Sequence, residues 1–134
     1  MILKKGKVQL DFSITNSQSH VGLSDDDYWC TVQFKVKNSQ IDLMSSIDMI
    51  SKNEFLGLIQ KLKLFMQDDF IQKGRITFIK NYFIVYLEAS LRIGRRMQIK
   101  LVHVNSDNDN FLLSFRQEEI LEFLHLLENE KNKI

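Results

Sequence analysis

The residues that could act in catalysis are three histidines, His20, His103 and His125, and the carboxylates near them. Glu122 and His125 form an E-x-x-H pair, a spacing that places a carboxylate and an imidazole on one face of a helix. A carboxylate-bridged metal site needs matching ligands from other helices, and the earlier helical segment offers few. A metal-dependent hydrolase built from His103, His125 and nearby carboxylates is therefore kept only as an alternative.

Other ligand-binding motifs are incomplete. Asp107 and Asp109, with the adjoining asparagines, begin like a calcium loop, but the glycine at the sixth position and the glutamate at the twelfth do not follow. A hairpin turn explains them better. The five glycines are scattered, so the chain has neither a phosphate-cradling loop nor a dinucleotide fingerprint. We predict that the protein is not an enzyme and carries no metal or other cofactor.

A binding edge is predicted where the longest loop, residues 16–27, meets the next strand. Three aspartates end the loop, and the strand carries a tryptophan and two lysines on its polar face. An outward tryptophan at a strand start is typical of an interface anchor. The alternative is a solvated loop and strand face, with the tryptophan covering the core. The candidate partner-binding residues are Asp25, Asp26, Asp27, Trp29, Lys35 and Lys37.

Charge narrows the choice of partner. The formal net charge of +1 is too small to give the whole surface a strong field, so general nucleic-acid binding is disfavoured. An electrostatic partner must then be selected by a local patch. Besides the aspartate run, the sequence offers a short basic cluster made of Arg92, Arg95 and Arg96.

The elements that position these residues begin with strands of alternating polarity. Apolar residues alternate with polar ones over residues 8–14 and 28–37, which predicts two strands that each bury one face. A third strand is expected near residues 40–47. Further strands are predicted at 75–80, 82–89, 95–104 and 111–115, with the 82–89 strand apolar on both sides and therefore central or covered.

Two helices are predicted from capping signals and apolar stripes. Ser51 and Glu54 match a capping box, in which a hydroxyl and a carboxylate satisfy free amides at a helix start, and an apolar stripe follows over residues 55–66. Ser114 and Gln117 have the same form before a closing helical stripe over residues 120–127. A tight hairpin junction is expected at residues 80–81.

The order of these elements predicts one α+β domain over residues 1–134. Strand runs followed by helices, without βαβ alternation, favour a mostly antiparallel, twisted sheet of about seven strands in the order βββ-α-ββββ-α, with both helices chiefly on one face. A chain of 134 residues fits a single core. The single cysteine, Cys30, falls on a buried strand face and indicates an inert core thiol.

Sequence signals for targeting are weak. The N-terminal residues lack an apolar segment typical of a secretory leader, and no stretch approaches the ~18 apolar residues that span a bilayer. We therefore expect a cytoplasmic protein without a membrane partner.

The strand order and several segments resemble the WapI-type family of bacterial immunity proteins. The resemblance covers most of the chain and rests on residues 27–34, 54–62, 78–87 and 113–121. It implies an α+β protein that binds and neutralises a cognate protein toxin in the producing cell, without catalysis. No catalytic residue is carried over, because the matched positions contain none.

The predicted function is therefore toxin neutralisation by occlusion, through an exposed sheet face or the edge formed by the long loop and Trp29. A general ligand-binding or self-binding domain, including a homodimer built on the two-sided strand at 82–89, is the second hypothesis. The metal-dependent hydrolase is the third.

Overall fold

The computed structural model describes residues 2–5, 8–37, 42–67, 73–102 and 110–134. The chain divides into two compact units, which we call unit 1 (Met1–Leu56 with His125–Ile134) and unit 2 (Gly57–Leu124). The expectation of one domain over residues 1–134 stays a prediction.

The elements follow the predicted order of three strands, a helix, four strands and a helix, preceded by a short additional strand. The strands are β1 (Ile2–Lys5), β2 (Val8–Ser19), β3 (Trp29–Lys37), β4 (Asp42–Ser51), β5 (Lys73–Ile76), β6 (Phe83–Ser90), β7 (Gly94–Val102) and β8 (Asn110–Arg116). The helices are α1 (Lys52–Gln67) and α2 (Gln117–Lys131), and each contributes residues to both units. Every strand pairing in the described ranges is antiparallel, which confirms the α+β class.

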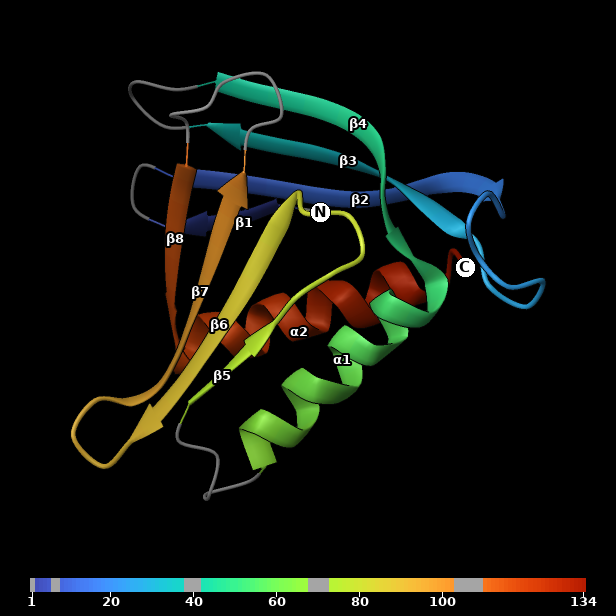
Figure 1. Ribbon diagram of the computed structural model, residues 1–134. Helices are drawn as coiled ribbons and strands as arrows, with labels where there is room; N and C mark the ends of the chain where they lie inside the picture. The colour runs from blue at the N-terminus through green and yellow to red at the C-terminus, as the bar shows by residue number, and fades with distance from the viewer. Residues whose placement is uncertain (1, 6–7, 38–41, 68–72, 103–109) are drawn as a thin grey trace. The chain divides into compact units, whose positions relative to one another are not determined.

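The strands form two sheets, which the sequence pattern did not separate. Unit 1 holds a four-stranded sheet in the order β1-β2-β3-β4, and unit 2 holds one in the order β5-β6-β7-β8 (Figure 1). Consecutive strands are neighbours throughout, so each sheet is a simple meander. β6 lies between β5 and β7, which is the inner position expected of a strand that is apolar on both sides.

The sheet of unit 1 follows the predicted alternation, with a longer second strand. Phe12, Ile14 and Val32 are buried, whereas the neighbouring Thr15 and Lys35 are exposed. β2 continues to Ser19, which pairs with Trp29 of β3. The connection between these strands therefore spans residues 20–28 rather than the predicted 16–27, because polar side chains do not prevent a backbone from extending its ladder.

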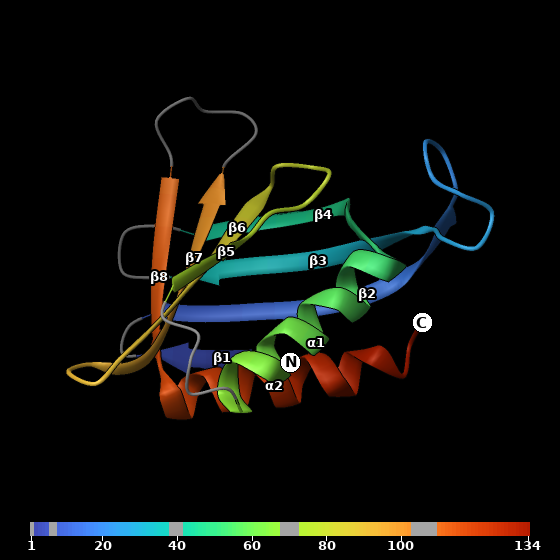
Figure 2. The same ribbon diagram turned by 60° about the horizontal axis from the view of Figure 1, so that its bottom comes forward.

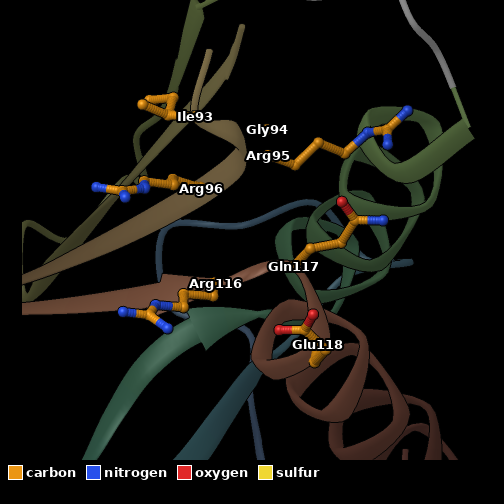
Figure 3. Close-up of a pocket in the computed structure, with 7 residues that line it drawn as sticks. All are labelled: Ile93, Gly94, Arg95, Arg96, Arg116, Gln117 and Glu118. Atoms are coloured by element: carbon orange, nitrogen blue, oxygen red, sulfur yellow. The ribbon is translucent and has the colours of Figure 1, made fainter. Parts of the chain in front are cut away.

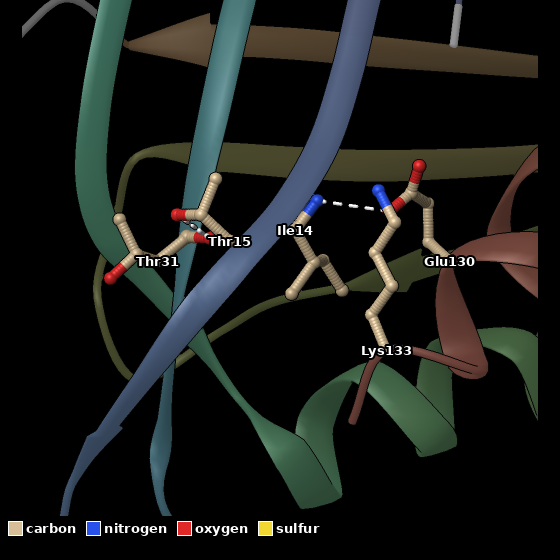
Figure 4. Close-up of polar contacts among 5 residues, drawn as sticks. All are labelled: Ile14, Thr15, Thr31, Glu130 and Lys133. Atoms are coloured by element: carbon tan, nitrogen blue, oxygen red, sulfur yellow. Dashed lines mark hydrogen bonds and ion pairs between the residues drawn. The ribbon is translucent and has the colours of Figure 1, made fainter.

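A buried carboxylate completes the edge of this sheet. β1 pairs with β2 only as far as Asp11, and beyond that point no strand of the described ranges pairs with β2 on that side. The amide of Ile14 donates instead to Oε2 of Glu130, at 3.1 Å, and the same oxygen lies 2.8 Å from Nζ of Lys133 (Figure 4). Glu130 is only 3% exposed, so its two contacts replace the solvation that burial removes.

The predicted capping box at the start of α1 is confirmed. The amide of Glu54 donates to Oγ of Ser51 and the amide of Ser51 donates to Oε1 of Glu54, both at 3.1 Å. The amide of Lys52 donates to the carbonyl of Tyr28 at 2.8 Å, so the connection between β2 and β3 is fastened to the helix start (Figure 2). These contacts supply acceptors for amides that have no partner within the helix.

The second capping prediction was wrong by two residues. α2 begins at Gln117, and the amide of Arg116 donates to Oε1 of Glu119 at 3.1 Å. Ser114 cannot serve as the cap because it lies within β8, opposite Gln98, whose side-chain Nε2 donates to the Oγ of Ser114 at 3.4 Å. Cross-strand pairing thus keeps the serine in the sheet and moves the helix start to the end of β8.

The sheet of unit 2 is covered by helix on one face. Met97 and Phe115 are paired and buried, and the Phe115 ring lies 6.1 Å from the ring of Phe123 in α2. Arg95, two residues before Met97 in β7, donates from Nε to the carbonyl of Phe65 in α1 at 3.1 Å. Both helical segments of this unit therefore lie on the Met97 face, and the opposite face carries the exposed side chains.

The junction at residues 80–81 is longer than a tight hairpin, because β5 ends at Ile76 and β6 starts at Phe83, with the rings of Phe78 and Phe83 stacked at 4.3 Å. Residues 40–41 of the third predicted strand and 107–109 of the predicted turn lie outside the described residues. Cys30 is buried, as expected.

In the part of the chain that the structure describes, neither helix has both the length and the apolar character needed to cross a membrane.

The Glu130 contact leads to a stability prediction. Glu130→Ala should lower the free energy of unfolding by about 2 kcal/mol, because the buried amide of Ile14 would lose its acceptor. Glu130→Gln retains an acceptor oxygen and loses only an ion pair to a half-exposed lysine, so its effect should stay below about 1 kcal/mol. Urea denaturation measures both, with the exposed Glu122→Ala on the same helix as control. Equal effects of the two alanine variants would contradict the role of Glu130.

Candidate functional site

Asp27 is not part of an exposed acidic surface, contrary to prediction. Its side chain is buried, and Oδ1 accepts hydrogen bonds from the amides of Tyr28 at 2.9 Å and Asn53 at 3.1 Å. Asn53 lies in the first turn of α1, where an anion is favoured by the free amides and the helix dipole. Asp27 therefore holds the β2–β3 connection on the helix start.

Trp29 is also buried, which corrects the prediction of an outward anchor. Only 5% of it is exposed, and Nε1 donates to the carbonyl of Val21 at 2.8 Å. The pairing of β3 with β4 shifts between Cys30 and Thr31, leaving Met49 as an extra residue in β4. That irregularity adds a residue to β4 and none to β3, so it does not change the face on which Trp29 lies. Trp29 is buried because the connection between β2 and β3 lies over it. The tryptophan packs beneath the connection, as the alternative reading proposed.

The rest of the connection is organised by local contacts. The His20 ring contacts the carbonyl of Asp27 through Nδ1 and the edge of the Tyr28 ring at 6.1 Å. Lys52 Nζ lies 5.5 Å from the centre of the Tyr28 ring. Burial, followed by the nearby Cys30 and Asp27, raises the pKa of Tyr28, so its hydroxyl stays protonated at neutral pH.

Asp25 and Asp26 remain exposed. Ser24 donates from Oγ to Asp26 at 2.7 Å, and this hydrogen bond is the main reason that the pKa of Asp26 is lowered. The carboxylate of Asp26 is therefore charged at neutral pH. Two exposed acids on a short connection form a small acidic surface.

Lys35 and Lys37 are exposed on β3, as predicted. Lys35 lies directly opposite Asp11 of β2, so its positive charge has an acidic residue as cross-strand neighbour. The structure therefore leaves the six predicted residues in three places: Asp27 and Trp29 inside, Asp25 and Asp26 on the connection, and the lysines on the sheet.

The histidine alternative gains no support from the described residues. His125 and Glu122 are both exposed on α2, and His103 lies outside the described residues. Among the residues that were described, no three His, Cys, Asp or Glu side chains are grouped as metal ligands.

Unit 2 contains a shallow hollow of about 340 Å³ where β7 begins and β8 runs into α2 (Figure 3). The Arg95 side chain points toward α1 and donates to the carbonyl of Phe65. The last turn of α1 contains no basic residue of its own, so Arg95 supplies a positive charge near the negative end of the helix dipole. The lining residues are Ile93, Gly94, Arg95, Arg96, Arg116, Gln117 and Glu118. These lining residues include no serine, threonine, cysteine, lysine or histidine, and their single carboxylate is Glu118.

The outer face of the same sheet is strongly basic. Alternation and register place five cations there, and the only carboxylate among the described residues of that face is Glu88. Uncharged neighbours, including the half-buried Ile84 and Tyr86, separate the charges. We call this surface the basic face; its cations are Lys73, Arg75, Arg96, Lys100 and Arg116.

One row of the basic face brings like charges together. Across the four strands, Lys73 pairs with Glu88, Glu88 with Arg96, and Arg96 with Arg116. Figure 3 shows the Arg96 and Arg116 side chains pointing the same way, away from Arg95. Like charges directly opposite each other destabilise a sheet. An anion bound between the two guanidinium groups would remove that repulsion.

Sequence reasoning found only part of this surface. The cluster of Arg92, Arg95 and Arg96 was recognised, but Arg95 and Arg96 point to opposite sides of β7. The alternation of side chains along that strand already places Arg96 and Lys100 on the face opposite Met97, and this pattern could have predicted a basic face. Arg75 and Arg116 join them only through the register in which β5 pairs with β6 and β8 pairs with β7.

Neither a protein-family model nor any curated protein matches the chain in sequence. The resemblance to WapI-type immunity proteins therefore stays a prediction.

A variant pair separates the structural aspartate from the exposed one. Asp27→Ala should lower the free energy of unfolding by about 1–2 kcal/mol, because two backbone amides lose their acceptor. Asp25→Ala removes the same charge from an exposed position and should change stability by less than about 0.5 kcal/mol. Thermal denaturation of both variants checks this. Similar melting temperatures for the two would refute the assignment.

The repulsion between Arg96 and Arg116 predicts a stabilising substitution. Arg116→Gln should raise the free energy of unfolding by roughly 0.2–1 kcal/mol at low ionic strength, because it removes a like charge from the row and a cation from the start of α2. The gain should shrink in high salt, which screens exposed charges. Arg92→Gln, outside the strands, is the control and should not stabilise. A loss of stability on Arg116→Gln would show that the charge is already compensated.

Proposed function

We propose that this protein binds and neutralises a cognate bacterial toxin by covering part of the toxin's surface, without catalysing a reaction. The resemblance of its strand order and packing residues to WapI-type immunity proteins supplies the class of partner. The basic face supplies the candidate contact surface.

The concentration of cations on the outer face of the β5–β8 sheet is the observation that carries the proposal. Among the residues described for this face there are five cations and one carboxylate, although the whole chain has a net charge of only +1. Such a patch favours a partner with an acidic surface, because complementary charge speeds encounter and fixes orientation. The partner surface should therefore be acidic where it meets the basic face.

The basic face is rigid enough to neutralise a toxin simply by covering part of its surface. The cations project from four strands joined by ladders of backbone hydrogen bonds, so their spacing is set by the sheet. A surface that is already ordered loses little conformational freedom on binding. Neutralisation then requires only that the bound protein block access to the toxin's site.

The basic face disfavours a homodimer built on β6. A two-fold contact would place the same surface of both copies together, so cations would face cations. The half-buried Ile84 and Tyr86 offer limited apolar area between those charges. A partner with acidic groups fits the face better than a second copy does.

Co-expression tests the proposal. The chain should restore growth to cells that produce a toxin-like protein encoded beside it, and purified chain should bind that protein. Arg75→Glu with Arg96→Glu should weaken binding by at least about tenfold, because two favourable charge contacts become repulsive. Lys35→Glu with Lys37→Glu, which makes the same charge change on the sheet of unit 1, is the control.

Two results would count against the proposal. Failure to rescue growth from any neighbouring toxin would argue against neutralisation itself. Rescue and binding that are lost with the Lys35 and Lys37 changes, but kept with the Arg75 and Arg96 changes, would move the interface to unit 1.

A further inference from the structure

The turn that joins β6 to β7 exposes aliphatic side chains beside the basic face. We call residues 90–94 the β6–β7 tip. Leu91 is fully exposed and Ile93 is 38% exposed, with the exposed Arg92 between them. The amide of Ile93 donates to Oγ of Ser90 at 3.1 Å, and Gly94 has a φ of 72°, a conformation that glycine adopts without strain. The tip is thus held in a defined turn while its aliphatic groups face solvent.

The tip adjoins the arginine pair of the basic face. Ile93, Arg96 and Arg116 line the same hollow, and Arg96 follows Gly94 closely along β7. Figure 3 shows Arg96 and Arg116 pointing to one side of the sheet at this end. Aliphatic and cationic groups therefore lie within reach of one short segment of a partner.

We infer that the β6–β7 tip and the Arg96–Arg116 pair form one docking surface for an acidic protein segment that carries an aliphatic side chain. The inference rests on the proposed function for its biological partner. Guanidinium groups recognise carboxylates through paired hydrogen bonds, and a carboxylate between the two arginines also relieves their mutual repulsion. The partner's aliphatic side chain packs on Leu91 and Ile93, which removes apolar surface from water on both sides.

Several features favour an acidic protein over a nucleic acid. The exposed apolar groups of the tip are aliphatic, whereas single-stranded nucleic acid is held largely by bases stacked on aromatic rings. Glu88 pairs with Arg96, and Glu118 lines the hollow, so a continuous phosphate backbone would meet two carboxylates. A peptide can place its carboxylates on the arginines and leave these positions uncharged.

Peptide binding to the full chain tests the inference without an identified toxin. The probes are a short acidic peptide with one central leucine, the same peptide with serine in place of leucine, and a single-stranded oligonucleotide of equal charge. Calorimetric titration at low ionic strength gives the affinities. The leucine peptide should bind most tightly, about threefold or more above the serine peptide.

Variants assign the contacts. Arg96→Gln with Arg116→Gln should weaken binding of both peptides by about tenfold. Leu91→Ser with Ile93→Ser should remove the preference for leucine and leave the serine peptide unaffected. Matched controls are Lys35→Gln with Lys37→Gln for charge, and Val21→Ser for an exposed aliphatic residue. Circular dichroism confirms that each variant is folded.

The outcomes separate this inference from the proposed function. Tighter binding of the oligonucleotide, absence of peptide binding, or peptide binding that ignores the tip and arginine variants would each overturn the docking surface. Growth rescue is measured independently, so rescue without peptide binding would leave neutralisation standing and remove only this surface. Peptide binding without rescue would leave the docking surface standing and argue against neutralisation.

Discussion

Carboxylates that accept hydrogen bonds from backbone amides define the junctions between elements. Asp27 and Glu54 do so at the start of α1, Glu119 at the start of α2, and Glu130 at the open edge of β2. A buried amide without an acceptor costs about 1–3 kcal/mol, and a helix start has four amides that need partners. An anion meets this need especially well where it also faces the positive end of a helix dipole. Asp27, Glu54 and Glu119 therefore stabilise the two helix starts, and Glu130 stabilises a strand edge.

The use of acids at junctions helps to explain why a nearly neutral chain has a basic face. Carboxylates that bind backbone amides are held at the ends of elements and do not balance cations on the sheets. On the outer side of the β5–β8 sheet only Glu88 remains among the described residues, and Lys73 and Arg96 both lie opposite it. The net charge of +1 describes the whole chain and says little about this surface.

Local sequence patterns predicted the elements and their order well, but not the division of the strands into two sheets. Alternation placed β2 and β3, and the capping box at Ser51 located α1, because these signals depend on neighbours within a few residues. The cap of α2 was misplaced because Ser114 is held in β8 by its pairing with Gln98. The division into two sheets likewise depends on contacts between distant residues. Of the predicted site residues, Lys35, Lys37, Asp25 and Asp26 are exposed as expected.

Register decides which charged residues can act together, and a single sequence does not contain it. Trp29 was expected outside because alternation predicts the face of a strand on which a residue lies but not whether another part of the chain covers that face, as the β2–β3 connection does here. In the opposite sense, Arg116 joins Arg96 only because β8 pairs with β7 in one particular register. A shift of one residue would turn Arg116 to the helix-covered face and leave Arg96 without its neighbour. The register that pairs the buried Phe115 with Met97 also pairs Arg116 with Arg96. The packing of the core therefore fixes where these two positive charges lie.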